Sequence, residues 1–236
     1  MPQIKPVFKC SDEFKSVFSQ SSCLLTISVG QEVHEGEKFL STVRLVNEAF
    51  KECTVLVDDS LQRHTMSLFS NLSPDELYQQ SIVEGDLWLE RSHQSLAQLT
   101  IPNKIIRWDK WLYHSLYEKY HHEITALYDT SRHYKDFINT SIEEFLTRLL
   151  RRNAIEVSYE TAFRRCLDYL KEECTALRLW ADTGYNFEIY PSRRNSAMTA
   201  THKIFVKSES YNFLVESVAI KFKNRAQLGP QVFTVE

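Results

Sequence analysis

The feature that most constrains the fold is a strand, a helix and a second strand in immediate succession near the start of the chain. Two short runs, CLLTIS at 23–28 and CTVLVDD at 53–59, have the length and the β-branched composition of buried strands. Between them, apolar residues such as Phe39, Val43 and Val46 recur at the spacing of one helix face. Strand, helix and strand within about 35 residues make a βαβ unit, which requires parallel strands and a right-handed crossover.

The rest of the chain continues this alternation. SPDE at 73–76 is a capping box with proline at the first helical position, and it predicts a long helix towards residue 98. The patterns predict strands at 103–108, 185–191 and 216–222, and helices after a cap at Asp109, at 134–152, and from Ser158 to a stop near Gly184. Such alternation predicts an α/β fold, with a mostly parallel, Rossmann-like sheet flanked by helices in a single domain over 1–236.

Composition excludes several other classes of protein. The 236 residues are 43% hydrophobic and 25% charged, which suits one large globular domain. No run approaches the roughly 18 apolar residues of a membrane span, and the first ten residues lack the apolar core of a secretory signal. Five cysteines without a CxxC motif favour reduced thiols, a cytoplasmic location and no metal site. At a net charge of −3, a polyanionic partner requires a local basic patch.

Ser28 lies at the end of the first strand and the Asp58-Asp59-Ser60 run at the end of the second, at the edge of the sheet where α/β proteins bind ligands. The pattern leaves two interpretations of Ser28 open: the N-cap of the next helix, or a nucleophile. Neither GxGxxG nor GxxxxGK(S/T) occurs, so no nucleotide-binding motif is supported. TISVG differs from the GxSxG nucleophile elbow by Thr26, and His202 is the one late histidine that could serve a hydrolase as base.

Tyr169 and Glu173 are four residues apart on the helix predicted from Ser158, so they share one face. Apolar neighbours on that face indicate that it points inward, where a carboxylate needs a partner or a function. The alternative is a tyrosine beside a solvated glutamate, with Glu172 on the outer side.

Basic residues cluster locally although the chain is acidic overall. The clusters are Arg148, Arg151 and Arg152 on one helix face, Lys104, Arg107 and Lys110 around IIRWDKW, and the pairs Arg164–Arg165 and Arg193–Arg194. Such clusters are usually solvated faces, but several of them on one protein can also line a phosphate backbone.

Taken together, LLTISVG, LVDDSLQRH, the Tyr169 and Glu173 pair, and EIYP resemble the cyclodipeptide synthases, between residues 20 and 222. The resemblance implies a fold similar to the catalytic domains of class I tyrosyl- and tryptophanyl-tRNA synthetases. It further implies a cytoplasmic aminoacyltransferase that joins two aminoacyl groups, taken from two aminoacyl-tRNAs, into a diketopiperazine. The resemblance implies no cofactor, no metal, no ATP and no membrane.

The resemblance also implies roles for individual residues. Ser28 matches the serine that carries the first aminoacyl group as an ester. Tyr169 and Glu173 match the pair that holds the ammonium group, and Glu173 is also suited to proton transfer. Tyr190 matches the tyrosine that positions the acyl-enzyme and assists cyclisation.

Other positions place the chain within the family. Gln31 and Pro191 stand where one subfamily carries Asn and His, which assigns the chain to the subfamily with Tyr-Pro. Thr26 replaces a frequent glycine and Thr175 a frequent proline, and both changes bear on the shape of the aminoacyl pocket.

Elementary chemistry agrees with this resemblance. An aminoacyl-tRNA is already an activated ester, so its transfer to serine needs mainly positioning and stabilisation of the oxyanion. Gly30 is expected to let the backbone approach closely there, beside Gln31. We expect the first aminoacyl pocket to be lined by Leu24, Thr26, Val57, Ala176 and Leu177, and the tRNA to contact Lys104, Arg107 and Lys110.

Two alternatives stay open at this point. A serine hydrolase with His202 as its base predicts activity on simple esters without tRNA. A non-catalytic module that binds the tRNA acceptor stem predicts binding without a covalent adduct.

Overall fold

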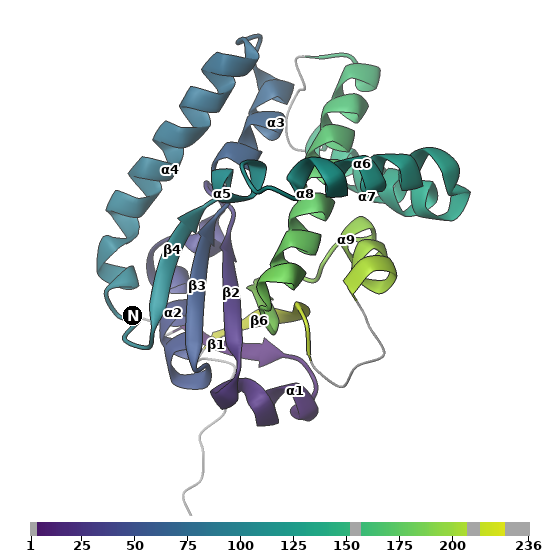
Figure 1. Ribbon diagram of the computed structural model, residues 1–236. Coiled ribbons are helices and arrows are strands. Elements are labelled where there is room, and N and C mark those ends of the chain that lie inside the picture. Colours follow the sequence, from purple (N-terminus) through teal and green to yellow (C-terminus); the bar gives the residue numbers. More distant parts are fainter. Residues whose placement is uncertain (1–3, 152–156, 207–212, 225–236) are drawn as a thin grey trace, which may run out of the picture.

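A six-stranded sheet forms the centre of the computed structural model, which describes residues 4–151, 157–206 and 213–224 (Figure 1). The strands are β1 (Ile4–Lys9), β2 (Ser22–Ile27), β3 (Glu52–Val57), β4 (Asn103–Arg107), β5 (Phe187–Tyr190) and β6 (Glu216–Asn224). Their order is β1-β6-β5-β2-β3-β4, and all neighbours are parallel except β1 and β6. The prediction of an α/β fold with a mostly parallel sheet is confirmed.

Helices form the crossovers between the parallel strands. The predicted βαβ unit is β2, α2 (Gly36–Ala49) and β3, and α4 (Pro74–Leu96) leads into β4. The other helices are α1 (Asp12–Val17), α3 (Arg63–Met66), α5 (Asp109–Leu112), α6 (Tyr117–Thr130), α7 (Arg132–Leu150), α8 (Tyr159–Thr183) and α9 (Ser196–Thr201). None of the helices described is long and apolar enough to cross a membrane.

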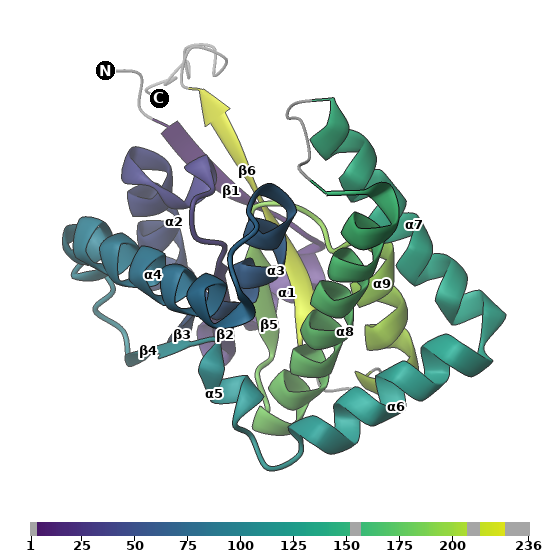
Figure 2. The same cartoon turned by 90° about the horizontal axis from the view of Figure 1, so that it is seen from above.

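The two faces of the sheet bury different parts of the chain. Odd-numbered residues of β2, β3 and β5, such as Leu25 and Val55, pack with α2 and with Trp88 of α4. Even-numbered residues such as Leu24 and Leu56 pack with side chains of α6, α7 and α8. Figure 2 shows α2 and α4 on one side of the sheet and α6 to α9 on the other. Because side chains alternate along a strand, residue parity decides which face a side chain enters.

Local signals set several helix boundaries as predicted. The Ser73 hydroxyl accepts a hydrogen bond from the N–H of Glu76 (3.3 Å), and the Glu76 carboxylate accepts one from the N–H of Ser73 (2.8 Å). Ser158 caps α8, and Gly184 ends it with a φ of 84°, which glycine adopts without steric cost. Arg152, expected on the basic face of α7, lies outside the described residues.

Other elements differ from the sequence prediction. The pattern does not reveal β1, because Pro6 interrupts it; the strand lies at the edge of the sheet, where proline is tolerated. Periodicity likewise does not separate the helices α1, α6 and α9 from their surroundings. The expected cap at Asp109 is wrong: Trp108 holds the N-cap position of α5, and the Asp109 carboxylate accepts hydrogen bonds from Ser60 and Tyr78.

Candidate active site

The carboxyl ends of β2, β3 and β5 border a cavity of about 640 Å³. The strand order reverses at β2, because β3 and β4 follow on one side and β5 and β6 on the other. Open α/β sheets bind their ligands at such a point. Ser28, Asp58 and Tyr190 lie at the ends of these strands, and all three line the cavity together with Tyr169 and Glu173 of α8.

Ser28 does not cap a helix. Its Oγ lies 3.0 Å from the hydroxyl oxygen of Tyr190, at the end of β5. The helix α2 begins only at Gly36, behind Glu35 at the N-cap position, and a short 3-10 helix (Glu32–His34) precedes it. Of the two interpretations left open by the sequence, the geometry therefore favours a serine whose hydroxyl faces a ligand site.

His34 holds the backbone of this serine. Its Nδ1 lies 3.0 Å from the main-chain nitrogen of Ser28 and 3.1 Å from the carbonyl oxygen. The imidazole is 1% exposed, and its ring packs edge-on against Tyr190 with 5.5 Å between ring centroids. Burial lowers the pKa of His34 to about 4, so the ring is neutral at pH 7. His34 therefore orients Ser28 and Tyr190, and no pattern in the sequence reveals this role.

Tyr169 and Glu173 face the cavity from α8, as their spacing predicted. The Glu173 carboxylate accepts a hydrogen bond from Nδ2 of Asn195 (3.2 Å), which lies at the start of α9. Burial raises the pKa of Glu173 to about 7, although the amide of Asn195 and the hydroxyl of Tyr169 favour its charged form. A carboxyl group that titrates near neutrality can both hold a cation and accept a proton.

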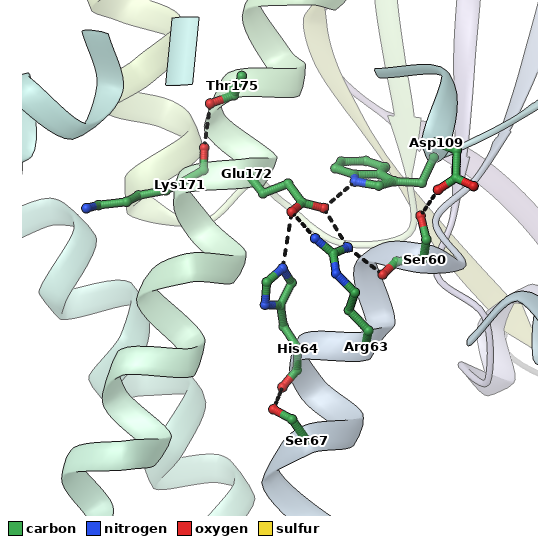
Figure 3. Close-up of polar contacts among 9 residues, drawn as sticks. Ser60, Arg63, His64, Ser67, Asp109, Lys171, Glu172 and Thr175 are labelled. Carbon is green, nitrogen blue, oxygen red and sulfur yellow. Dashed lines mark hydrogen bonds and ion pairs between the residues drawn. The ribbon is translucent and has the colours of Figure 1, made fainter. Parts of the chain in front are cut away.

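Glu172 is buried, and its expected place on the outer side of α8 is wrong. Its carboxylate accepts hydrogen bonds from both terminal nitrogens of Arg63, and Nε1 of Trp108 donates to Oε1 at 2.7 Å. Nε2 of His64 lies 3.2 Å from Oε2 (Figure 3). Burial alone would raise the pKa of Glu172, but hydrogen bonds from His64 and Arg63 outweigh it and lower the pKa to about 2. The Glu172 cluster, formed by Glu172, Arg63, His64 and Trp108, joins α3 to α8 behind the wall of the cavity. His64 is itself part of that wall.

The structure places only some of the residues predicted for the aminoacyl pocket at the cavity wall. Thr26 and Gln31 line the cavity. The cavity wall does not include Leu24, Val57, Ala176 and Leu177, all of which are completely buried. Val57 is odd-numbered and points to the opposite face of the sheet, into the core beneath α2 and α4. The other three pack in the core between the sheet and the helices α6 to α9.

Gly30 serves a turn. Its φ is 83°, in the left-handed region that favours glycine, and a Cβ atom there would meet no protein atom within 4 Å. The close approach of this backbone to the substrate stays a prediction. The turn brings Gln31 round to the cavity, and the N–H of Gln31 donates to the carbonyl oxygen of Ser28 (3.3 Å).

The three residues expected to contact tRNA have different surroundings. Lys104 on β4 and Lys110 on α5 are exposed. The guanidinium of Arg107 instead forms ion pairs with Asp59 and Asp86 and donates to the carbonyl oxygen of Ile82 (2.8 Å). These contacts give Arg107 a structural role between β4 and α4. Other arginines of the predicted clusters, namely Arg148, Arg165, Arg193 and Arg194, line the cavity.

His202 is not placed to serve Ser28. It is buried, its Nε2 lies 2.9 Å from the carbonyl oxygen of Leu214, and it is not part of the cavity wall. The serine hydrolase alternative therefore loses its expected base. Among the residues that the structure describes, no group of three His, Cys, Asp or Glu side chains is arranged to hold a metal ion.

Comparison with solved structures identifies close similarity along nearly the whole chain. A CDPS (cyclodipeptide synthase) from Fluoribacter dumoffii is 45% identical, with a TM-score of 0.90, and the match covers 94% of this chain and 99% of that one. A cyclodipeptide synthase from Candidatus Glomeribacter gigasporarum, solved bound to Phe-tRNAPhe, is 18% identical with a TM-score of 0.68 over 91% of this chain and 92% of that one. No family model and no curated protein matches the chain.

The fold is also that of a class I synthetase. Tyrosyl-tRNA synthetase from Pyrococcus horikoshii is 11% identical, with a TM-score of 0.50, and the match covers 85% of this chain and 51% of that one. At this identity the match supports the fold alone. The 45% identity to the Fluoribacter enzyme, over almost the full length of both chains, decides the family. The chain is a member of the cyclodipeptide synthases.

Proposed function

We propose that this cyclodipeptide synthase carries the first aminoacyl group on Ser28 and completes the diketopiperazine with a second aminoacyl-tRNA. The observation that carries the proposal is the convergence of Ser28, Tyr190, Tyr169 and Glu173 on one cavity at the switch point of the sheet. A nucleophile, a hydroxyl partner and a carboxyl group of near-neutral pKa are the components that acyl transfer requires.

In the first transfer, Oγ of Ser28 attacks the carbonyl carbon of the aminoacyl ester. The new bond joins Oγ to that carbon, the bond to the tRNA ribose oxygen breaks, and the serine proton ends on the ribose oxygen. One ester replaces another, so the step needs positioning and charge stabilisation more than driving force. The hydroxyl of Tyr190, 3.0 Å from Oγ, is placed to relay this proton.

In the second transfer, the amine of the Ser28-bound aminoacyl group attacks the ester of the second aminoacyl-tRNA. A peptide bond forms, the second tRNA leaves, and the dipeptidyl group stays on Ser28. The attacking amine must be neutral, and Glu173 is the group that takes its proton. The pKa of Glu173, about 7, lies within about one unit of the usual 7.7–8.0 of an α-amino group, so this proton transfer costs little.

Cyclisation then releases the product. The free amine of the dipeptide attacks the ester carbonyl carbon on Ser28, the second peptide bond forms, and Oγ of Ser28 regains its proton. The reaction needs no ATP, because both esters arrive already activated. We place the reaction in the cytoplasm, where aminoacyl-tRNAs are made, and the five free thiols agree with that compartment.

The tRNA surface is also a proposal. Lys104, near the start of β4, and Lys110, on α5, are exposed cations. The arginines on the cavity wall can meet the phosphates nearest the aminoacyl end. A module that only binds tRNA would need no serine paired with a tyrosine hydroxyl inside the cavity. That pairing favours the enzyme over the binding module.

Mass spectrometry of culture medium from bacteria that express the chain tests the function. The wild type is expected to release cyclic dipeptides that a Ser28→Ala variant, expressed to the same level, does not release. Identical products from both strains would overturn the role of Ser28. Soluble wild-type protein that yields no cyclic dipeptide, and no aminoacyl adduct when it is incubated with aminoacyl-tRNA, would overturn the proposed function.

A further inference from the structure

The cavity contains a carboxyl group that the steps above do not use. Asp58 directly follows β3, and its main-chain N–H donates to the carbonyl oxygen of Ile27 (2.8 Å), which extends the β2–β3 ladder. The residue is 7% exposed, and its Oδ1 has no hydrogen-bond partner within the part of the chain that the structure describes. Its parity is that of Thr54 and Leu56, so the side chain points to the face of α8 and lines the cavity.

The neighbouring carboxylates are each provided with donors. Glu188 forms an ion pair with Arg194. Asp59 forms an ion pair with Arg107 and accepts the N–H of Ser60 (2.7 Å), and Glu173 accepts from Asn195. A buried carboxylate that lacks such a donor costs stability, and a cation from the cavity would remove that cost. Among the buried carboxyl groups described at this wall, Asp58 is therefore the one that is ready to receive a positively charged group.

Every aminoacyl-tRNA brings at least one cation into the cavity, the α-ammonium group of its amino acid. We propose that Asp58 is a substrate-binding residue, which pairs with the α-ammonium group of the aminoacyl ester on Ser28 together with Tyr169 and Glu173. This inference rests on the proposed function. Burial, and then the nearby Glu173 and Glu188, raise the pKa of Asp58, so a bound cation would also restore its charge.

The proposal needs two carboxyl groups, because a single group cannot both take the proton of the ammonium group and continue to hold the amine. When Glu173 takes the proton of the ammonium group, Glu173 becomes neutral and no longer attracts a cation. The free Oδ1 of Asp58 then accepts a hydrogen bond from one of the two N–H bonds that the amine keeps. The nitrogen lone pair is then free, and the amine is still held in place for its attack on the second ester.

The test compares two substrates that differ only in the group Asp58 is proposed to bind. Bulk tRNA charged with amino acids is one substrate, and the same pool after nitrous acid has converted the α-amine to an α-hydroxyl is the other. The rate of Ser28 acylation is followed by intact-protein mass for the wild type, Asp58→Asn and Glu188→Gln. Asp58→Asn is expected to slow acylation by aminoacyl-tRNA about 10- to 100-fold, and to leave acylation by hydroxyacyl-tRNA unchanged.

The control substitution and the thermal stability separate binding from folding. Glu188→Gln removes a cavity carboxylate that already has a partner, so it should change both rates by the same factor. Asp58→Asn removes a buried carboxyl group that must give up its charge or its hydration when the chain folds, and it should raise Tm, on the order of 2–4 °C. Equal slowing of both substrates by Asp58→Asn, or no slowing of either, would overturn the proposal. If Asp58→Asn does not fold, Asp58→Ser takes its place with the same expected ratio. A wild type that forms no adduct from either pool would instead overturn the proposed function.

Discussion

At the scale of single residues, the proposed acyl transfer depends most directly on the contact between Ser28 and Tyr190. The two hydroxyl oxygens are 3.0 Å apart. Removing the tyrosine oxygen in Tyr190→Phe keeps the ring that packs against His34 and is expected to slow acylation of Ser28 by about 100-fold, because a preorganised hydrogen-bonding group near the reacting oxygen is removed. The acylation rate, followed by intact-protein mass, checks this.

The exposed Tyr159 at the start of α8 provides the matched control, because Tyr159→Phe removes a phenol oxygen far from the cavity wall. That variant should acylate at the wild-type rate. If Tyr190→Phe also acylates at that rate, the hydroxyl of Tyr190 takes no part in the transfer.

The raised pKa of Glu173 predicts how the stability of the fold depends on pH. Its pKa is about 7 in the folded chain and about 4.5 in an unfolded one, so the folded state binds the proton more tightly. The resulting stability is fully present below pH 4.5 and is lost as the pH rises through 7. Glu173→Gln carries no such cost at high pH, and its free energy of unfolding at pH 8.5 should exceed that of the wild type by about 2–3 kcal/mol.

The same substitution removes the proposed base, so activity and stability should move in opposite directions. Urea unfolding at pH 4.5 and 8.5 measures the first effect, and cyclic dipeptide yield the second. An unfolding free energy that is equal for the two proteins at both pH values would contradict the raised pKa of Glu173.

Part of the candidate site could be predicted from the sequence, residue by residue. The end of a strand and the spacing of a helix made Ser28, Tyr169 and Glu173 candidates but left alternatives open, and the resemblance added their roles and Tyr190. Parity along the strands, applied consistently from Ser28, would have rejected Val57 and selected Asp58. No local pattern points to His34, because its contact with Ser28 depends on the turn through Gly30.

At the scale of elements, α8 supplies the cavity with Tyr169 and Glu173, and the Glu172 cluster fixes α8 against α3 (Figure 3). Glu172→Gln leaves the Arg63 guanidinium without its buried counter-charge. Loss of one partner of a buried ion pair typically costs about 3–5 kcal/mol, and we expect a loss of that order in the free energy of unfolding. Denaturant unfolding at pH 7 measures it.

Asp168→Asn is the control on the same helix, because Asp168 is exposed. It should change the free energy of unfolding by less than about 0.5 kcal/mol. A Glu172→Gln variant as stable as Asp168→Asn would show that the cluster does not hold α3 and α8 together.

Helix ends were easier to predict than helix faces. Ser158, Gly184 and the capping box at Ser73 act through bonds within a few residues, so the sequence contains the whole signal. The burial of Glu172 depends on Arg63 and Trp108, which are far away in the sequence and become neighbours only through the fold. The edge strand β1 depends in the same way on β6, at the other end of the chain.

At the scale of the whole molecule, the distribution of charge separates residues that stabilise the fold from residues available to tRNA. The double variant Lys104→Ala and Lys110→Ala is expected to leave stability unchanged. A plot of the logarithm of tRNA affinity against the logarithm of salt concentration should become less steep, by about one unit for each phosphate contact that is lost. Arg107→Ala is expected to lower stability instead, because it leaves the fully buried Asp59 without its counter-charge.

Filter binding of bulk tRNA over a salt series, with thermal unfolding of the same proteins, distinguishes the two effects. If the salt dependence of binding is unchanged in the double lysine variant, the two lysines do not contact tRNA phosphates. The arginines of the cavity wall would then be the proposed tRNA contacts. A fully stable Arg107→Ala variant would contradict the structural role assigned to Arg107.

The topology of the whole molecule was predictable in its class but not in its details. The βαβ unit fixed a parallel sheet, and the alternation of elements fixed α/β architecture. The place of β5 beside β2 was not predictable from the pattern, since more than half of the chain separates them, and it is this pairing that brings Tyr190 to Ser28. The candidate site thus depends on the strand order.

The proposed role of Ser28 is tested most directly by finding the aminoacyl group on the protein. The purified chain is mixed with aminoacyl-tRNA, quenched in acid, digested and analysed by mass spectrometry. We expect an aminoacyl ester on the peptide that contains Ser28, and we expect it to disappear when a second portion of aminoacyl-tRNA is added and cyclic dipeptide forms. An adduct on another residue, or cyclic dipeptide formed by Ser28→Ala, would contradict that role.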